Sequence, residues 1–160
     1  MTNKIAVLSG DGIGPEVINE ALKVLNVISN KIKVNFEFNK CLVGASAIDL
    51  EGNPFPDSTK KICDNSDAIL FGAIGDPKYD NNPSAKVRPE QGLLGIRESL
   101  GVFANIRPVI IYPSLAKASP LKEEKLIDVD LIVIRELTGG IYFGEKNRTE
   151  NKASDLCVYH

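Results

Sequence analysis

Residues 131–145 read Leu-Ile-Val-Ile-Arg-Glu-Leu-Thr-Gly-Gly-Ile-Tyr-Phe-Gly-Glu, and this stretch decides the fold. Its apolar start is typical of a strand buried on both faces of a sheet. Arg135 and Glu136 follow where that strand leaves the core, which in an open α/β sheet is the carboxyl edge where ligands bind. The two glycines permit a tight turn towards Tyr142. The stretch therefore predicts a guanidinium and a phenol over one cleft.

A second interpretation of these residues stays open at this point. Arg135 and Glu136 could form an ion pair at the edge of the core, with Tyr142 as a packing residue. The rest of the chain has to decide between the two.

The amino terminus has the outline of a nucleotide-binding start without its fingerprint. An apolar strand is expected over residues 4–8, then a turn rich in glycine, then a helix that begins at Pro15 and continues to about Ile28. Gly10 and Gly12 fit the spacing Gly-x-Gly-x-x-Gly, but its third glycine would fall at position 15, which is proline. A Rossmann fold is therefore disfavoured, and a plain tight turn is the alternative explanation for the glycines.

Strands and helices alternate along the middle of the chain, which predicts a largely parallel α/β sheet. Between residues 72 and 89 the periodicity is lost, and such a long loop after a strand is typical of a functional segment. Pro108 predicts an edge strand or a domain crossing for residues 103–112. The other expected elements are strands at 34–38, 68–71 and 129–134, and helices at 57–63 (capped by Asp57), at 90–100 and from Ser119-Pro120.

Composition and charge exclude several classes of protein. The chain has 160 residues, 43% of them hydrophobic and 25% charged, with a net charge of −2, as expected of a globular protein. Its basic residues are scattered, which argues against nucleic acid or a membrane surface as partner. Three separated cysteines favour reduced thiols and a cytoplasmic location. The only histidine is His160, so an acid or base within the chain must be Tyr, Lys, Asp or Glu.

The helix expected at 90–100 carries an unusual face. Glu90, Leu93, Leu94 and Arg97 are three or four residues apart and so share one side. An ordinary amphipathic helix with both leucines in the core is the simple alternative, but charges at both ends of a core-facing stripe are costly. For Arg107 a solvated surface position is equally open at this point.

Four motifs together carry a resemblance over the whole length. They are Gly10-Asp11-Gly12-Ile13-Gly14-Pro15-Glu16, Arg88-Pro89-Glu90-x-Gly92-Leu93-Leu94-x-x-Arg97, Phe103-Ala104-Asn105-Ile106-Arg107-Pro108 and Arg135 to Glu145. They are collinear with the 3-isopropylmalate dehydrogenase family, a branch of the β-decarboxylating dehydrogenases that also include the isocitrate dehydrogenases. The last motif is the most specific of the four.

The resemblance implies a fold and a domain organisation. The implied fold is α/β, with two domains around a cleft as in isopropylmalate and isocitrate dehydrogenases, and it is not a Rossmann fold. Residues 1–101 would be the amino-terminal part of the first domain, and residues 102–160 the start of the second. From about residue 141 the chain would enter an arm that pairs with the other subunit of a homodimer. Because residues 156–159 read as a strand cut short, we expect only the amino-terminal part of the enzyme here.

The activity implied by the resemblance is oxidation of (2R,3S)-3-isopropylmalate by NAD, followed by loss of CO2 to give 4-methyl-2-oxopentanoate in leucine biosynthesis. Mg²⁺ or Mn²⁺ would assist. The metal ligands, the lysine base and the main adenine loop of the family have no counterpart up to His160, so no metal ligand is named in this chain. These 160 residues alone are predicted to be inactive.

Site residues carry over at matching positions. Arg97, Arg107 and Arg135 match the arginines that bind the malate group, and planar guanidinium forks suit a dicarboxylate. Tyr142 matches the tyrosine that protonates the enol carbon after decarboxylation. Ile13 matches a position that packs against adenine. The cofactor-side segment is Asp76, Pro77, Lys78, Tyr79, Asp80, Asn81, Asn82, Pro83, Ser84, Ala85, Lys86, Val87, Arg88, Pro89 and Glu90.

Substrate choice follows from Glu90, Leu93 and Leu94. Isocitrate carries a third carboxylate where isopropylmalate has a branched alkyl group. Two leucines and a carboxylate would repel that anion and favour an isopropyl group. Isocitrate, homoisocitrate and tartrate relatives are the alternatives within the family. A non-catalytic anion-binding α/β module and a decarboxylase without redox chemistry are alternatives outside it, and the module predicts that the three arginines scatter.

Overall fold

The computed structural model describes residues 2–80, 85–140 and 142–159. The chain separates into two compact units, unit 1 over Met1–Leu100 and unit 2 over Gly101–His160.

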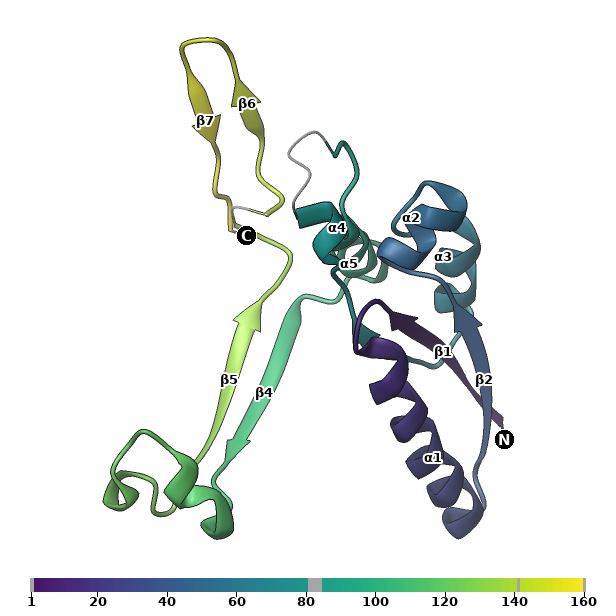
Figure 1. Cartoon of the computed structure of the whole chain (residues 1–160), viewed down its shortest axis with the longest axis vertical. Coiled ribbons are helices and arrows are strands. Elements are labelled where there is room, and N and C mark those ends of the chain that lie inside the picture. The colour runs from purple at the N-terminus through teal and green to yellow at the C-terminus, as the bar shows by residue number, and fades with distance from the viewer. Residues whose placement is uncertain (1, 81–84, 141, 160) are drawn as a thin grey trace. The chain divides into compact units, whose positions relative to one another are not determined.

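A three-stranded parallel sheet forms the centre of unit 1 (Figure 1). The middle strand, β1 (Thr2–Gly10), lies between β2 (Asn35–Cys41) and β3 (Ala68–Ala73), and both neighbours run parallel to it. Residues 5–8 of β1 are buried, as expected for an apolar run covered on both faces. The parallel sheet predicted from the alternation of strands and helices is confirmed for this unit.

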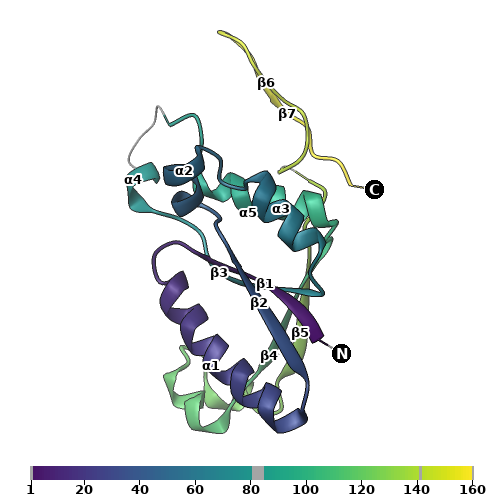
Figure 2. The ribbon, with the colours of Figure 1, turned by 90° about the vertical axis from the view of Figure 1, so that its right-hand side faces the viewer.

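Five helices accompany the sheet within the described residues of unit 1. They are α1 (Gly14–Ile32), α2 (Ala45–Glu51), α3 (Asp57–Asp64), α4 (Pro77–Asp80) and α5 (Pro89–Leu100). Helix α1 lies on one face of the sheet, and α3 and α5 lie on the other (Figure 2). The sequence pattern predicted α1, α3 and α5, but missed α2 and α4, which are short and carry no long apolar stripe.

Two apolar clusters bury the two faces of the sheet. Ile18 of α1 packs with Ile5 and Val7 on one face. Cys63 of α3 and Ile96 of α5 pack with the side chains of β1 that alternate with these, on the other. Because side chains of a strand alternate between faces, β1 supplies both clusters.

The cap predicted for α3 is wrong. Pro56 is the N-cap residue, and Asp57 is the first helical residue, with no side-chain hydrogen bond to the helix end. Pro56 has an extended backbone, and its ring fixes φ. The helix therefore begins after Pro56 without a side-chain cap. The carboxylate of Asp57 still lies in the first turn, where the helix dipole favours a negative charge.

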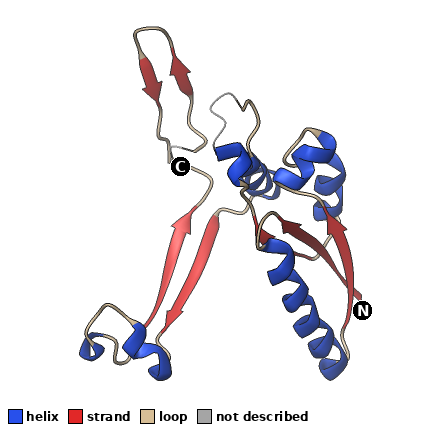
Figure 3. Ribbon diagram, viewed as in Figure 1, coloured by secondary structure: helices blue, strands red, loops and turns tan. Residues whose placement is uncertain are grey.

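Unit 2 consists of two antiparallel pairs, shown as ribbons in Figure 3. Strand β4 (Ala104–Ile110) pairs with β5 (Asp130–Glu136), and β6 (Lys146–Arg148) pairs with β7 (Ala153–Asp155). Pro108 lies within β4, opposite Ile132, and among the described residues β4 has a partner on one side only. The edge position predicted from Pro108 is therefore confirmed, and the pairing of β5 with β4 is antiparallel.

The burial predicted for the apolar run of β5 is also wrong in this chain. Leu131, Ile132, Val133 and Ile134 are 46%, 59%, 47% and 70% exposed. Within the part of unit 2 that the structure describes, their one strand partner is β4, and the helical turns of the unit gather at one end of this ribbon (Figure 3). Among the described residues of unit 2, therefore, no layer covers the two faces of the ribbon.

The helix predicted from Ser119-Pro120 is replaced by two 3₁₀ turns, at Pro113–Ala118 and Glu123–Lys125. The Ser119 hydroxyl accepts a hydrogen bond from the Leu121 backbone N–H at 3.1 Å. A serine that bonds the backbone two residues later stabilises a turn rather than a helix. Residues 156–159 likewise form no strand, apart from an isolated bridge between Val158 and Gly140.

All three cysteines are free thiols, as predicted. Burial raises the pKa of the Cys63 thiol to about 11, so this thiol is almost entirely protonated at neutral pH. Within the described ranges, no helix combines the length and the apolar character that crossing a bilayer needs.

Candidate functional site

The order of strands in unit 1 creates a topological switch point at the carboxyl edge of the sheet. From β1 the chain passes to α1 on one face, and from β3 it passes towards α5 on the other. Because β1 and β3 are neighbours, their loops diverge, and such a switch point is where ligands bind in open α/β sheets. The predicted residues Ile13, Asp76 and Glu90 all follow one of these two strands.

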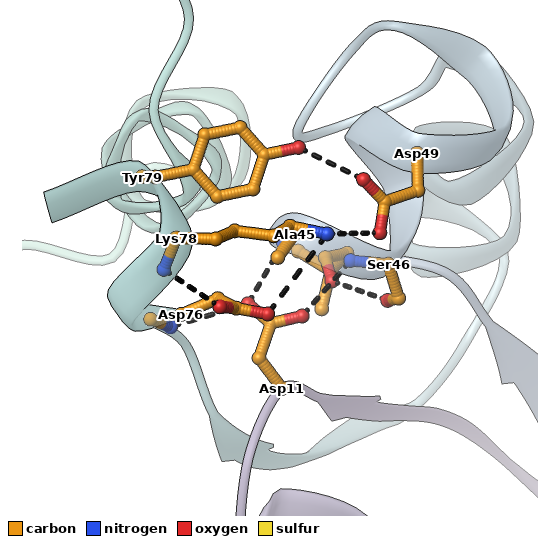
Figure 4. A network of polar contacts seen from close by, with 9 residues as sticks. Asp11, Ala45, Ser46, Asp49, Asp76, Lys78 and Tyr79 are labelled. Atoms are coloured by element: carbon orange, nitrogen blue, oxygen red, sulfur yellow. Dashed lines mark hydrogen bonds and ion pairs between the residues drawn. The ribbon is translucent and has the colours of Figure 1, made fainter. Parts of the chain in front are cut away.

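The buried carboxylate of Asp11 ties the loops of this edge together (Figure 4). It accepts hydrogen bonds from the backbone N–H groups of Ala45 (2.8 Å) and Ser46 (3.0 Å), the first two residues of α2. It also accepts one from Gly75 N–H, at 3.1 Å, in the loop after β3. One side chain thus fixes the ends of all three strands, and sequence reasoning did not single it out.

Close packing explains two of the glycines in the first loop. A Cβ at Gly10 would lie 1.8 Å from the Ala73 carbonyl oxygen, and one at Gly14 would lie 2.1 Å from that of Ser9. Gly12 is different, because a Cβ there would meet nothing closer than 3.9 Å, the carbonyl oxygen of Gly75. Gly10 and Gly14 therefore serve chain packing, whereas Gly12 has a φ of +55°, a backbone conformation that glycine adopts without strain.

A polar cluster holds the first turn of the cofactor-side segment. Asp49 of α2 accepts a hydrogen bond from Lys78 Nζ at 2.5 Å and another from the Tyr79 hydroxyl at 3.0 Å. Asp76 Oδ1 accepts the Lys78 backbone N–H at 3.0 Å, and its other oxygen lies 4.0 Å from Lys78 Nζ. Figure 4 shows Asp49 between the ammonium and the phenol.

These contacts shift the pKa values of the cluster in consistent directions. Hydrogen bonds from Lys78 and Tyr79 lower the pKa of Asp49. The bond to Asp49 raises the pKa of Lys78. Partial burial, then the Asp49 carboxylate, raises the pKa of Tyr79. Asp49 and Lys78 therefore stay oppositely charged at neutral pH.

The remainder of the predicted cofactor-side segment lies in three places. Asp80 ends α4. Asn81, Asn82, Pro83 and Ser84 lie outside the described residues. The segment that leads into α5 consists of Ala85, Lys86, Val87 and Arg88. Pro89, the first residue of α5, is buried. Glu90 is exposed, and its Oε1 lies 3.6 Å from the position that a Cβ of Gly75 would take.

The face of α5 that carries the predicted substrate residues is not the core face. Pro89, Gly92 and Ile96 are the buried residues of this helix. Leu93, Leu94 and Arg97 are half-buried, and neither leucine belongs to an apolar cluster of the sheet. The alternative in which both leucines fill the core is therefore wrong, because the helix turns its glycine side towards the Pro54 carbonyl instead.

In unit 2, both predicted arginines lie on one face of the β4–β5 ribbon. Arg135 is directly opposite Asn105, and opposite residues of an antiparallel pair point to the same side. Arg107 is two residues beyond Asn105, hence on that same face. Its Nε donates a hydrogen bond to Asn105 Oδ1 at 2.6 Å, which holds the guanidinium there. Arg107 is thus oriented by a neighbour that sequence reasoning missed.

The predicted meeting of Arg135 and Tyr142 is present. Arg135 Nη2 donates to the Tyr142 hydroxyl at 3.3 Å, and its guanidinium carbon lies 5.9 Å from the ring centroid. Glu136 does not pair with Arg135. Its carboxylate accepts bonds from the Thr138 hydroxyl (2.6 Å) and from the Thr138 and Gly139 backbone N–H groups, which lower its pKa. The alternative of an Arg135–Glu136 ion pair is therefore wrong.

Two kinds of ligand chemistry are thus represented. Unit 1 has a topological switch point at the carboxyl edge of its sheet, with a charged cluster beside it, which suits a nucleotide cofactor. Unit 2 presents two guanidinium groups and a phenol, which suits a small dicarboxylate. Arg97 belongs to unit 1, so its meeting with Arg107 and Arg135 stays a prediction. Within residues 2–80, 85–140 and 142–159, no group of three His, Cys, Asp or Glu could hold a metal, and no step is assigned to a metal here.

A parallel-sheet unit with a topological switch point, followed by a ribbon bearing two arginines beside a tyrosine, defines a mixed α/β protein with candidate anion-binding groups. Comparison with known proteins specifies the class further. The chain belongs to the isocitrate/isopropylmalate dehydrogenase family, whose model matches residues 4–160. The predicted fold, which is that of this family and not a Rossmann fold, is thereby confirmed.

Curated relatives named 3-isopropylmalate dehydrogenase are similar to this chain. The relative from Bacteroides fragilis is 53% identical over 161 residues, which is 99% of this chain and 45% of that protein. The relative from Prochlorococcus marinus is 58% identical over 142 residues, which is 89% of this chain and 39% of that protein. The chain therefore spans less than half the length of the relatives it matches.

Solved structures have the same fold. A β-decarboxylating dehydrogenase from Thermococcus kodakarensis aligns with a TM-score of 0.64 at 28% identity, over 99% of this chain and 41% of that one. An isocitrate dehydrogenase from Methylococcus capsulatus aligns with a TM-score of 0.76 at 24% identity, over 99% of this chain and 43% of that one, and shows the fold alone.

Proposed function

We propose that this chain is the amino-terminal part of an enzyme that oxidises (2R,3S)-3-isopropylmalate with NAD and releases CO2, giving 4-methyl-2-oxopentanoate for leucine biosynthesis. The proposal rests mainly on one observation in unit 2. Arg107 and Arg135 lie on the same face of the β4–β5 ribbon, and the Tyr142 hydroxyl contacts Arg135. The names of the relatives support the choice of substrate. Units 1 and 2 would be parts of the two family domains, with the cleft between them.

Arg107 and Arg135 would bind the malate carboxylates, and Arg97 of α5 would join them across the cleft. Guanidinium forks bind carboxylates through two parallel hydrogen bonds and stay charged at every physiological pH. Three such groups would hold the diacid in one orientation and stabilise the negative charge that grows during decarboxylation. The shared face of Arg107 and Arg135 disfavours the non-catalytic module, which predicts scattered arginines.

Tyr142 would donate the proton that ends the reaction. Loss of CO2 leaves an enol whose carbon must gain a proton, and a phenol can supply it as a general acid. Because Arg135 Nη2 contacts the Tyr142 hydroxyl, a diacid bound by Arg135 would have this hydroxyl beside its carboxylates.

NAD would occupy the carboxyl edge of the sheet in unit 1. Ile13 is 58% exposed beside this edge, so its side chain is free to pack against adenine. Residues 76–80 and 85–90 would line the nicotinamide side, and the cofactor would accept the hydride. The described residues do not by themselves fit Mg²⁺ or Mn²⁺, and family ligands would have to come from elsewhere. We also propose that the complete enzyme is a homodimer in the cytoplasm. Its two subunits would pair through an arm that begins near residue 141.

The proposal is tested by purifying the complete gene product and measuring NADH formation. We expect turnover with 3-isopropylmalate that a chelator abolishes, and little turnover with isocitrate. Residues 1–160 alone should give none. Turnover of isocitrate at the same rate, or activity of the isolated 160 residues, would contradict the proposal.

Leu94 tests the basis of substrate choice. Replacing Leu94 with Ser in the complete gene product should lower kcat/KM for isopropylmalate by about 10- to 200-fold, since each lost apolar contact with the isopropyl group costs about 1–3 kcal/mol. Leu50→Ser is the matched control, because Leu50 is 73% exposed on α2. An equal loss in both variants would show that Leu94 does not contact the substrate.

A further inference from the structure

Asp49 is the residue around which the polar cluster of unit 1 is organised, although it lies on α2 and outside the cofactor-side segment. Each of its two carboxylate oxygens accepts one hydrogen bond, Oδ2 from Lys78 Nζ and Oδ1 from the Tyr79 hydroxyl. Both donors are neighbours in the four-residue helix α4. A helix of one turn has little stability of its own, so its position depends on such contacts.

The opposite side of the cluster is anchored in the sheet. Asp11 fixes the start of α2 through Ala45 and Ser46, and it fixes the loop before α4 through Gly75. Helix α2 is thus held rigidly at its start, and Asp49 extends from it to α4. The contacts form a closed ring that runs from Asp11 through α2 and Asp49 to α4 and back through Gly75.

We propose that Asp49 is a positioning residue that sets the distance of α4 from the carboxyl edge of the sheet, and so preorganises the nicotinamide side of the cofactor site. The inference rests on the proposed function. It concerns cofactor affinity alone, because the arginines proposed for the diacid lie on α5 and in unit 2. Lys78 and Asp49 are 46% and 49% exposed in their side chains, so their ion pair adds little to global stability.

The test uses Asp49→Ala in the complete gene product. We expect the dissociation constant of NAD, measured by calorimetry, and the KM for NAD to rise about 5- to 20-fold, because a binding segment displaced by about 1 Å loses affinity of this order. The KM for isopropylmalate and the Tm should stay unchanged. Asp49→Glu keeps the charge and should recover most of the affinity, whereas Glu51→Ala, an exposed carboxylate on the same helix, should bind NAD as the wild type does.

Tyr79→Phe isolates the second contact. Alone it should raise the dissociation constant of NAD about 2- to 3-fold, and in the Asp49→Ala background it should add nothing, since the two groups act as one unit. Unchanged NAD affinity in Asp49→Ala, or equal rises of the KM for NAD and for isopropylmalate with a lowered Tm, would overturn the positioning role. If the wild type oxidises another diacid with NAD, only the proposed substrate fails; if the wild type binds no NAD, both proposals fail.

Discussion

Replacing Tyr142 with Phe in the complete gene product is expected to lower kcat on isopropylmalate by about 10²- to 10⁴-fold, the range typical of a lost general acid. The ring and its contact with the Arg135 guanidinium remain, so the KM for the diacid should change little. The whole hydroxyl is removed, and with it the proton donor and the hydrogen bond from Arg135 Nη2. In a single turnover, NADH should still form at about one equivalent per site, while 4-methyl-2-oxopentanoate accumulates slowly.

Tyr112→Phe is the control for this experiment. Tyr112 is 62% exposed and lies in unit 2 beyond the end of β4, as the residue before the 3₁₀ turn at Pro113–Ala118. Its variant should retain the wild-type kcat. If Tyr142→Phe also kept kcat within about threefold of the wild type, a general-acid role for Tyr142 would be wrong.

The largest expected effect on stability belongs to Asp11→Ala. The substitution leaves three backbone donors without their acceptor, those of Ala45, Ser46 and Gly75. Because an unsatisfied buried donor costs about 1–3 kcal/mol, the free energy of unfolding should fall by at least about 3 kcal/mol. Urea denaturation followed by circular dichroism measures the change.

Asp11→Asn keeps the volume and one acceptor oxygen, so it should lose less and still fold. Asp64→Ala, an exposed carboxylate at the end of α3, should change the free energy of unfolding by no more than about 0.5 kcal/mol. A loss below about 1 kcal/mol in Asp11→Ala would mean that the Asp11 carboxylate does not hold the loops together.

Local sequence patterns predicted unit 1 well, since its central strand and longer helices bury apolar stripes within the same unit. They predicted β5 as a strand but not its exposure, because the pattern shows only that the run is apolar and not which segment covers it. The helix predicted from Ser119 is absent for a local reason. A serine hydroxyl can cap a helix or stabilise a turn, and that of Ser119 accepts a hydrogen bond from the Leu121 backbone N–H in a turn.

The sequence predicted one contact of the candidate site whose residues lie close together in the chain. Arg135 and Tyr142 are seven residues apart across a glycine turn, and they meet as predicted. Asp11 was missed because its partners, the backbone N–H groups of Ala45, Ser46 and Gly75, are distant in the sequence. Asn105 bonds Arg107 only two residues later, so their spacing along one strand face was the available signal for it. An acidic residue between Gly10 and Gly12, directly after a buried strand, is the signal that could have identified Asp11.

The central claim is that the side chains at 97, 107, 135 and 142 surround one diacid. The most direct measurement is a crystal structure of the complete gene product with isopropylmalate. The account predicts that Arg97, Arg107 and Arg135 each lie within hydrogen-bond distance of a substrate carboxylate, about 2.7–3.0 Å, with the Tyr142 hydroxyl beside them. A bound diacid with any of these guanidinium groups facing away from it would contradict the account.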